Sequence, residues 1–509
     1  ASDSTVIGFS HTHLSGTGIG DLFDITVMPV VGEVTYARGE ENDPASGLWS
    51  YADRTREITK PGYYSVPLVR YGITAELTAT ERVGLHRYTF PASDAAAVVF
   101  DLENGGCWDK ATDTGFRFSD DSTRIAGWRC STGWAKNQEV YFVAEFSKPA
   151  KGISYLQPGE IDDSKMPRIA ARYARVDFDT AEGEQVLVKV ALSPVSIKGA
   201  KANLAAELPG WDFDATAAAA DKAWNDELSK VKIETADETA RRIFYTALYH
   251  TMIAPSLFCD VNGDYYGSDH AIHRNAGFTN YTTFSLWDTY RAAMPLMTVL
   301  HPEKMADIVQ TMLHIADEQG RLPVWHLWGN ETDCMVGNPG IVAVADAIVK
   351  GIGGFDREKA FEAIRKTAMN PDRGNGLRME YGYIPCEMFN EAVAYDMEYA
   401  LADGAAARAA EALGKAEDAK YFEERSHSYR NYFDPQTGFM RGRDSKKGWR
   451  TPFNAFASTH RADDYCEGNA WQYTWLAPHD VAGLVGCFGS RARMLEKLDS
   501  LFTVSSVIE

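Results

Sequence analysis

The spacing of apolar residues changes near residue 205, and this change limits the folds that the chain can adopt. Before it, apolar and polar residues alternate, as they do from Ile73 to Thr80. Such alternation is typical of a half-buried β-strand. The runs 141–147 and 186–192 are further strand candidates, and clusters of Gly, Asp, Asn and Ser separate these runs. Many short strands with turns between them predict an antiparallel β-sandwich.

From about residue 212 the apolar residues instead follow the 3.6-residue period of an α-helix. Pro302 suits a first helical position, and the residues after it place an apolar stripe on one face. Asp356 is expected to cap a second helix. An alanine-rich helix over 391–413 ends at Gly414, and 416–433 is its expected antiparallel partner. Helices paired by short loops over roughly 300 residues predict an α/α toroid.

The predicted fold class is therefore an α+β multidomain protein, with a sandwich followed by a toroid. We expect the sandwich over residues 1–205, a helical linker over 206–235 and the α/α toroid over 236–509. The alanine-rich segment 215–230 supplies the helix of the linker. Both ends of the sequence interrupt apolar stretches, so we also expect a portion of a longer protein, truncated at both ends.

The net charge of −20 restricts the partners of the chain. Binding to nucleic acid requires a basic face, and an anionic membrane surface attracts basic segments, so both partners are disfavoured. No run of about 18 apolar residues is present, which predicts no membrane insertion. The seven cysteines include no CxxC pair, and a zinc site has little support. A neutral substrate or a cation fits this composition better.

Three segments of the helical half combine carboxylates, amides and aromatic rings. They are 287–291, 325–331 and 467–473. A sugar offers hydroxyl groups and an apolar ring face, so its binding site needs these three kinds of side chain together. Loops that open helices converge at the mouth of a toroid, which predicts one shared sugar pocket. The candidate residues are Trp287, Asp288, Arg291, Glu331, Glu467 and Trp471.

Each candidate also has a purely structural interpretation. Tryptophans in a helical domain more often belong to the core. Asp288 would serve equally as a helix cap or as the ion-pair partner of Arg291. Glu331 would be a solvated loop residue, and Glu467 would stabilise a helix N-terminus.

Two further motifs resemble metal sites. Asp260–Asp264 resembles the start of an EF-hand loop, but Tyr265 stands where that loop needs glycine, so we predict a tight turn. His11 and His13 lie on one side of a strand as a possible metal pair. No third ligand is identifiable near them, which favours a hydrogen-bonding role.

Four motifs, in order and across almost the whole chain, resemble glycoside hydrolase family 92, the bacterial exo-α-mannosidases. They are Gly8–Gly18, Ser285–Arg291, Gly329–Gly337 and Glu467–Tyr473. The resemblance implies a β-sandwich joined to an (α/α)6 barrel. It also implies calcium as cofactor, an inverting mechanism, and terminal α-mannosyl residues of mannans or N-glycans as substrates. A secreted, periplasmic or cell-surface location follows from the same resemblance.

The resemblance also assigns roles to individual residues. It places the general acid at Glu467 and a mannose-binding carboxylate at Asp288. Asn469 and Gln472 are weaker candidates for the metal and substrate shell, and His13, near His11, is expected to help close the pocket. The family's catalytic base lies in an aspartate-rich motif beyond the end of this sequence. Asn338–Pro339 departs from the family, which has tyrosine or asparagine followed by histidine there.

An inverting glycosidase needs a protonated acid at the leaving oxygen and an ionised base that activates water on the opposite face. We therefore expect Glu467 to be partly buried, so that its carboxyl group keeps its proton until transfer. Two other functions remain open at this point. One is a glucosidase or phosphorylase of similar architecture acting on α-glucosides, and the other is a glycan-binding protein without catalysis.

Overall fold

The computed structural model describes residues 5–14, 20–40, 43, 46–156 and 171–505. The end of the predicted Gly8–Gly18 motif, residues 15–18, lies outside the described residues. The chain forms two compact units. The first, the β unit, comprises Ala1–Tyr266, His270–Thr283 and Leu327–Asn330. The second, the helical unit, comprises Gly267–Asp269, Phe284–His326 and Glu331–Glu509.

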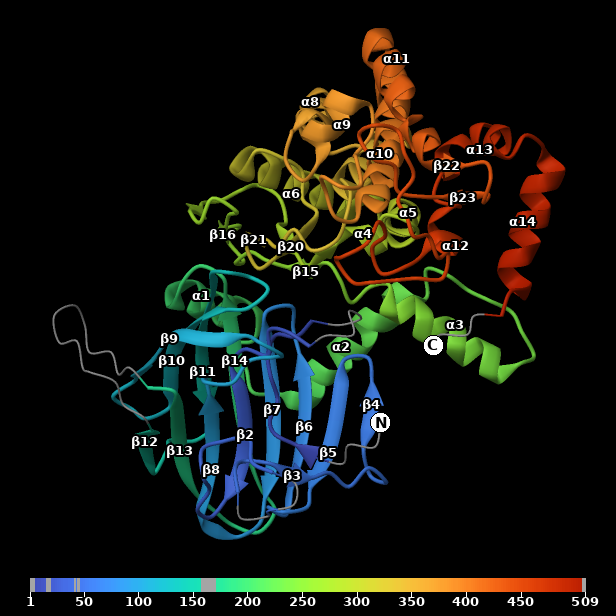
Figure 1. Cartoon of the computed structure of the whole chain (residues 1–509). Coiled ribbons are helices and arrows are strands. Elements are labelled where there is room, and N and C mark those ends of the chain that lie inside the picture. The colour runs from blue at the N-terminus through green and yellow to red at the C-terminus, as the bar shows by residue number, and fades with distance from the viewer. Residues whose placement is uncertain (1–4, 15–19, 41–42, 44–45, 157–170, 506–509) are drawn as a thin grey trace. The chain divides into compact units, whose positions relative to one another are not determined.

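The β unit contains two antiparallel sheets that form a sandwich (Figure 1). The larger sheet has the order β4-β5-β6-β7-β14-β11-β10-β9, and the smaller has the order β12-β13-β8-β2. The strands are β2 (Thr26–Val31), β4 (Ile58–Lys60), β5 (Tyr63–Leu68), β6 (Ile73–Ala79), β7 (Val83–Phe90), β8 (Ser93–Asp101), β9 (Lys110–Phe118), β10 (Arg124–Thr132), β11 (Gln138–Phe146), β12 (Gly152–Leu156), β13 (Tyr173–Thr180) and β14 (Glu184–Ser193). The three predicted strands are confirmed as β6, β11 and β14.

Aromatic side chains fill the space between the two sheets. Phe100 of β8 stacks on Phe142 of β11, with ring centroids 5.9 Å apart. Phe146 of β11 meets Phe178 of β13 edge to face at 5.7 Å. Buried aromatic pairs of this kind add to the hydrophobic stabilisation of the core. The predicted sandwich is therefore confirmed.

A buried ion cluster fixes the N-terminal segment to this sandwich. Arg129 of β10 is fully buried between Asp24, at 2.6 Å, and Asp109. The Thr12 hydroxyl donates a 2.6 Å hydrogen bond to Asp24. Because a buried charge needs partners, this cluster holds in place the segment that carries His11 and His13.

Three helices also belong to the β unit: α1 (Ile197–Glu207), α2 (Phe213–Leu228) and α3 (Glu238–His250). Helix α2 corresponds to the predicted linker helix and begins after Asp212, whose carboxylate accepts from the Ala215 N–H. The compact units thus place α3 with the sandwich. The domain boundaries at 205 and 235 stay predictions.

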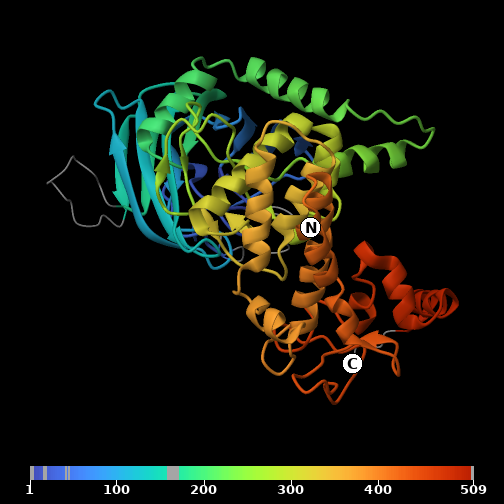
Figure 2. The ribbon, with the colours of Figure 1, turned by 90° about the horizontal axis from the view of Figure 1, so that it is seen from above.

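The helical unit contains α4 (Leu286–Thr289), α5 (Ala293–Leu300), α6 (Pro302–Gln319), α7 (Pro339–Val349), α8 (Arg357–Met369), α9 (Asn375–Tyr381), α10 (Ala392–Ala412), α11 (Ala416–Arg425), α12 (Ala470–Tyr473), α13 (Val481–Phe488) and α14 (Arg491–Thr503). Helix α10 packs against α7, α8 and α11, and its alanines permit this close approach. Figure 2 shows the long helices of this unit from above. Among the described residues, no helix is both long and apolar enough to cross a membrane.

Local signals in the helical half behave as expected at most positions. Pro302 opens α6, Asp356 caps α8 by accepting from Glu358 N–H, and Gly414 follows α10 with a φ of +72°. Helix α11 is shorter than its predicted range 416–433. It ends at Arg425, because a 3₁₀ turn over Ser428–Tyr432 follows and buries two tyrosine rings in the core.

Candidate functional site

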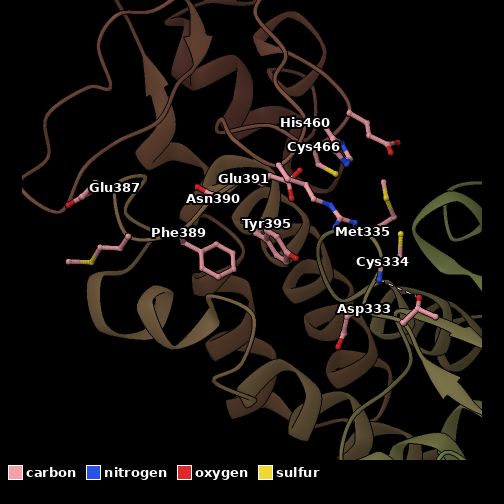
Figure 3. Close-up of a pocket in the computed structure, with 14 residues that line it drawn as sticks. Asp333, Cys334, Met335, Glu387, Phe389, Asn390, Glu391, Tyr395, His460 and Cys466 are labelled. Atoms are coloured by element: carbon pink, nitrogen blue, oxygen red, sulfur yellow. Dashed lines mark hydrogen bonds between the residues drawn. The ribbon is translucent and has the colours of Figure 1, made fainter. Parts of the chain in front are cut away.

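Glu467 is one of the residues that line a cavity of about 580 Å³ in the helical unit. Figure 3 shows this cavity with its lining side chains. Four segments line it: 332–335, 387–391 with Tyr395, 460–461 and 466–467. They come from the loops before α7, α10 and α12. Of the predicted sugar-binding candidates only Glu467 lines this cavity, so a pocket shared with the segments 287–291 and 325–331 stays a prediction. The volume lies in the range of cavities that hold small ligands.

Glu467 stands at the edge of this cavity. The residue precedes α12 and has a left-handed backbone, with a φ of +47°. Its side chain is exposed, so the expectation of partial burial is wrong for the described residues.

Asp288 lies in the electrostatic field of Glu467. Desolvation by the surrounding protein raises the pKa of Asp288, the Glu467 carboxylate raises it further, and Arg291 opposes both effects. Asp288 lies within α4, and the helix that follows, α5, has no side-chain cap, so Asp288 does not cap it. Two carboxylates from widely separated segments of the sequence thus lie close enough for the charge of one to affect the pKa of the other.

The buried Glu398 of α10 holds the rest of the 287–291 segment. Its Oε1 accepts from the Trp287 indole N–H at 3.0 Å and from the Arg291 guanidinium at 2.6 Å. Its Oε2 accepts from the Tyr290 hydroxyl at 2.8 Å. Glu398 is only 3% exposed, so these three donors supply the partners that a buried carboxylate requires. Trp287 and Arg291 are therefore fixed beside Asp288.

Glu398 was missed by the sequence interpretation. Burial raises its pKa, and Arg291 is the strongest influence in the opposite direction. A signal was available, because an acid on a fully buried, alanine-rich helix needs a partner. Gly337 has a φ of +81°, and a Cβ at this position would overlap the Cβ of Glu398.

Glu331 has a local structural role in the geometry described. Its Oε1 accepts from the N–H groups of Trp325 and Asp333, and its Oε2 accepts from that of Val324. These bonds hold the loop that leads to Cys334 at the cavity wall. Contact between Glu331 and a substrate stays a prediction.

Helix α12 carries the remaining predicted residues. The Gln472 Oε1 accepts from the Asn469 N–H at 3.0 Å, and the Asn469 side chain faces the Gln472 N–H, so the two residues form a capping box. The Asn469 Oδ1 is buried and makes no hydrogen bond of normal geometry. Trp471 packs edge to face on Phe439 at 4.8 Å and also lies under the Lys497 ammonium, which favours the core interpretation for this ring. Their roles toward metal and substrate stay predictions.

His13 belongs to the β unit, where it lines a second cavity of about 770 Å³. Its side chain is exposed, and desolvation lowers its pKa. His11 lines the same cavity and bonds to Ile25 O at 2.6 Å and to His86 Nε2 at 2.9 Å. Desolvation lowers the pKa of His11 to about 4. Both His11 ring nitrogens are thus engaged in hydrogen bonds, as the sequence predicted.

The Asp260–Asp264 segment, also in the β unit, is the predicted tight turn. The Asp260 N–H donates to Asp264 O at 2.8 Å, and Gly263 has a φ of +82°. The Asp260 carboxylate accepts from Ser193 and Asn203, so it has protein partners in place of a metal.

Comparisons with known proteins agree with this picture. The sequence model of the glycosyl hydrolase family 92 catalytic domain matches residues 199–508, and that of the family's N-terminal domain matches residues 1–193. An uncharacterized secreted glycosidase of the fungus Arthroderma benhamiae is 25% identical over 567 aligned residues. This alignment covers 98% of the chain and 68% of the fungal protein.

Two solved structures from Bacteroides thetaiotaomicron are similar to the whole chain. A family 92 α-mannosidase in complex with mannoimidazole is 39% identical with a TM-score of 0.95, and the match covers 100% of this chain and 68% of that one. A family 92 inverting mannosidase is 29% identical with a TM-score of 0.86, and the match covers 98% and 67% respectively.

Proposed function

Since the chain belongs to glycosyl hydrolase family 92 and is a glycoside hydrolase, we propose that it removes terminal α-mannosyl residues from mannans or N-glycans. The observation that carries the proposal is that Glu467 lines a cavity large enough for a sugar and lies close enough to Asp288 to raise its pKa. The similar Bacteroides enzymes, one named an α-mannosidase and one an inverting mannosidase, support the choice of sugar and mechanism.

In this proposal Glu467 donates its proton to the glycosidic oxygen as the bond to the sugar breaks. Its place at the open edge suits that task, because the departing group extends from the cavity into solvent. Asp288 accepts a hydrogen bond from a mannose hydroxyl. Glu398 orients Asp288 indirectly, because it binds the neighbouring Trp287 and Arg291. The base that activates water stands roughly 6.5–9.5 Å from the acid in an inverting enzyme, and we place it outside these 509 residues.

Calcium is part of the proposal, and one residue of the site fits it. Calcium prefers neutral and anionic oxygen ligands, and the buried Asn469 Oδ1 is an amide oxygen without a hydrogen bond of normal geometry. Gln472 fits less well, because its oxygen already accepts from Asn469 N–H. When bound, calcium would polarise neighbouring ring hydroxyls of mannose and favour a flattened, positively charged ring.

The location of the protein is proposed as secreted, periplasmic or at the cell surface. The fungal relative is named a secreted glycosidase, and extracellular glycans are the substrates proposed here.

The proposal is tested by Glu467→Gln in the full-length protein. Loss of the acid should lower the turnover of α-mannobiose by about 10²–10⁴-fold, the usual contribution of general acid–base catalysis. Binding of mannoimidazole should persist. Turnover of a dinitrophenyl α-mannoside should fall less than that of mannobiose, because its leaving group needs no proton. Glu417→Gln, the same change at the exposed start of α11, serves as control. Undiminished turnover of mannobiose, or cleavage of α-glucosides instead, would contradict the assignment.

A further inference from the structure

Glu391 places a second glutamate carboxyl group on the wall of the Glu467 cavity. The residue precedes α10, lines the cavity and is 8% exposed. In Figure 3 its side chain lies in the middle of the lining residues, between Tyr395 and Cys466. The sequence interpretation did not single it out, because it stands at the beginning of an alanine-rich helix where an acid is ordinary.

The carboxyl group of Glu391 does not cap this helix. An acid before a helix usually accepts from the N–H groups of the first turn, but Glu391 makes no such bond. Backbone carbonyl oxygens of another loop accept hydrogen bonds from this end of the helix instead. Glu391 N–H donates to Asp463 O at 2.7 Å, and Ala394 N–H donates to Asp464 O at 3.1 Å. The side chain is therefore not required for the start of α10.

One oxygen of this carboxyl group lacks a partner. Glu391 Oε1 is buried and has no hydrogen bond to any of the described residues. The remaining protein partner is the Cys466 side chain, and burial raises the pKa of Glu391 while Cys466, Arg461 and His460 lower it. An unsatisfied buried oxygen is costly, so its persistence beside a cavity indicates a ligand that supplies the missing bond.

The backbone of Glu391 points to function as well. Its φ is +55°, and that of Glu467 is +47°. Left-handed conformations are uncommon for residues other than glycine, and they concentrate at sites where a side chain must be aimed. Two glutamates with this conformation face one cavity from two different loops.

We propose that Glu391 is a substrate-binding residue whose Oε1 forms a hydrogen bond with one hydroxyl group of the sugar held in the Glu467 cavity. This inference rests on the proposed function, because it takes a sugar as the ligand. It adds a contact that selects for a particular hydroxyl, separate from the proton transfer by Glu467.

A thermodynamic cycle between the residue and the sugar tests this inference. Dissociation constants are measured by calorimetry for methyl α-mannoside and its four monodeoxy derivatives, in full-length protein with Glu467→Gln so that no sugar is consumed. The same panel is measured after adding Glu391→Ala. We expect one monodeoxy sugar to bind about 10-fold more weakly than methyl α-mannoside when Glu391 is present, and no more weakly than it when Glu391 is alanine.

Three controls make each outcome decisive. Glu391→Gln repeats the cycle with an isosteric side chain and replaces the alanine variant if that protein does not fold. Glu417→Gln should leave the whole panel unchanged. If, for all four monodeoxy sugars, the loss in binding affinity from removing the hydroxyl is the same with and without Glu391, the proposed role of Glu391 is wrong. Failure of the wild-type protein to cleave mannobiose, with no binding of methyl α-mannoside, would instead reject the proposed function.

Discussion

Two glutamates of the α10 segment, Glu391 before the helix and Glu398 within it, have opposite surroundings at the residue scale. Glu398 has three donors from the 287–291 segment, whereas Glu391 has one buried oxygen without a partner. The first is a structural support for its neighbours, because both of its carboxylate oxygens accept hydrogen bonds within the protein. The second has bonding capacity left for a ligand.

The raised pKa of Glu391 predicts how its replacement affects stability. A carboxyl group whose pKa is higher in the folded state binds its proton more tightly there, so it costs stability as the pH rises above the ordinary value of about 4.3. Glu391→Gln removes this cost. We expect the variant to gain stability relative to the wild type between pH 4 and pH 7, measured by urea unfolding. A difference that stays constant over this range would contradict the prediction.

His11 predicts the reverse dependence, in the β unit. Its pKa is lowered to about 4 in the folded state, so between about pH 6.5 and pH 4 the unfolded chain binds a proton at this histidine and the folded chain does not. Stability should therefore fall as the pH decreases from about 6.5 to about 4, by on the order of 3 kcal/mol from this group. In His11→Asn the fall should be smaller by about that amount. The same replacement at the exposed His250 serves as the control.

At the scale of elements, the site depends on the packing of α10 against the loop before α7. Gly337 lies in that loop, where a methyl group would collide with Glu398. The sequence predicted α6, α8 and α10 from their apolar stripes and end signals, since these depend on neighbours along the chain. It did not predict this contact, because the two residues meet only through tertiary packing.

Gly337→Ala should destabilise the helical unit by about 2 kcal/mol, since it adds both a left-handed alanine and an overlap with α10. Gly414→Ala separates the two causes. Gly414 also has a positive φ, but open space surrounds it, so the loss there should be about 1 kcal/mol. Thermal unfolding and mannoside turnover are measured for both variants, and only Gly337→Ala should lower turnover. Equal losses in stability would show that overlap with Glu398 does not matter.

Over the whole molecule, the net charge of −20 makes a bound cation favourable and anionic partners unfavourable. If calcium binds the folded chain as proposed, it raises the melting temperature by mass action. Addition of EDTA should lower both the melting temperature and mannoside turnover, and added calcium should restore them. Asn469→Ala should weaken the calcium-dependent rise, whereas Asn225→Ala, at an exposed position of α2, should not. A melting temperature indifferent to calcium in wild-type protein would reject calcium binding.

The two-part architecture was predictable because hydrophobic period reports burial directly, and strands β6, β11 and β14 show the expected alternation. The place of Glu467 beside a cavity was also predictable, from family motifs and the mixture of side chains around it. The exposure of Glu467 was not predictable, because solvent access at a loop depends on segments that are distant in the sequence. The same reason explains why the oxygen of Glu391, left without a partner, could not be seen in the sequence.

The hydrogen bonds from Glu391 and Ala394 to the carbonyls of Asp463 and Asp464 have a mechanical consequence. They attach the segment that leads to Glu467 to the N-terminus of α10, the longest helix among the described residues of the unit. A displacement of that helix would carry both glutamates together, so the spacing between them is insulated from motions elsewhere. Exposed rim positions such as Met388 and Asn390 lie outside this attachment. Substitutions at these exposed positions should therefore alter the lining of the cavity while leaving the two glutamates in place.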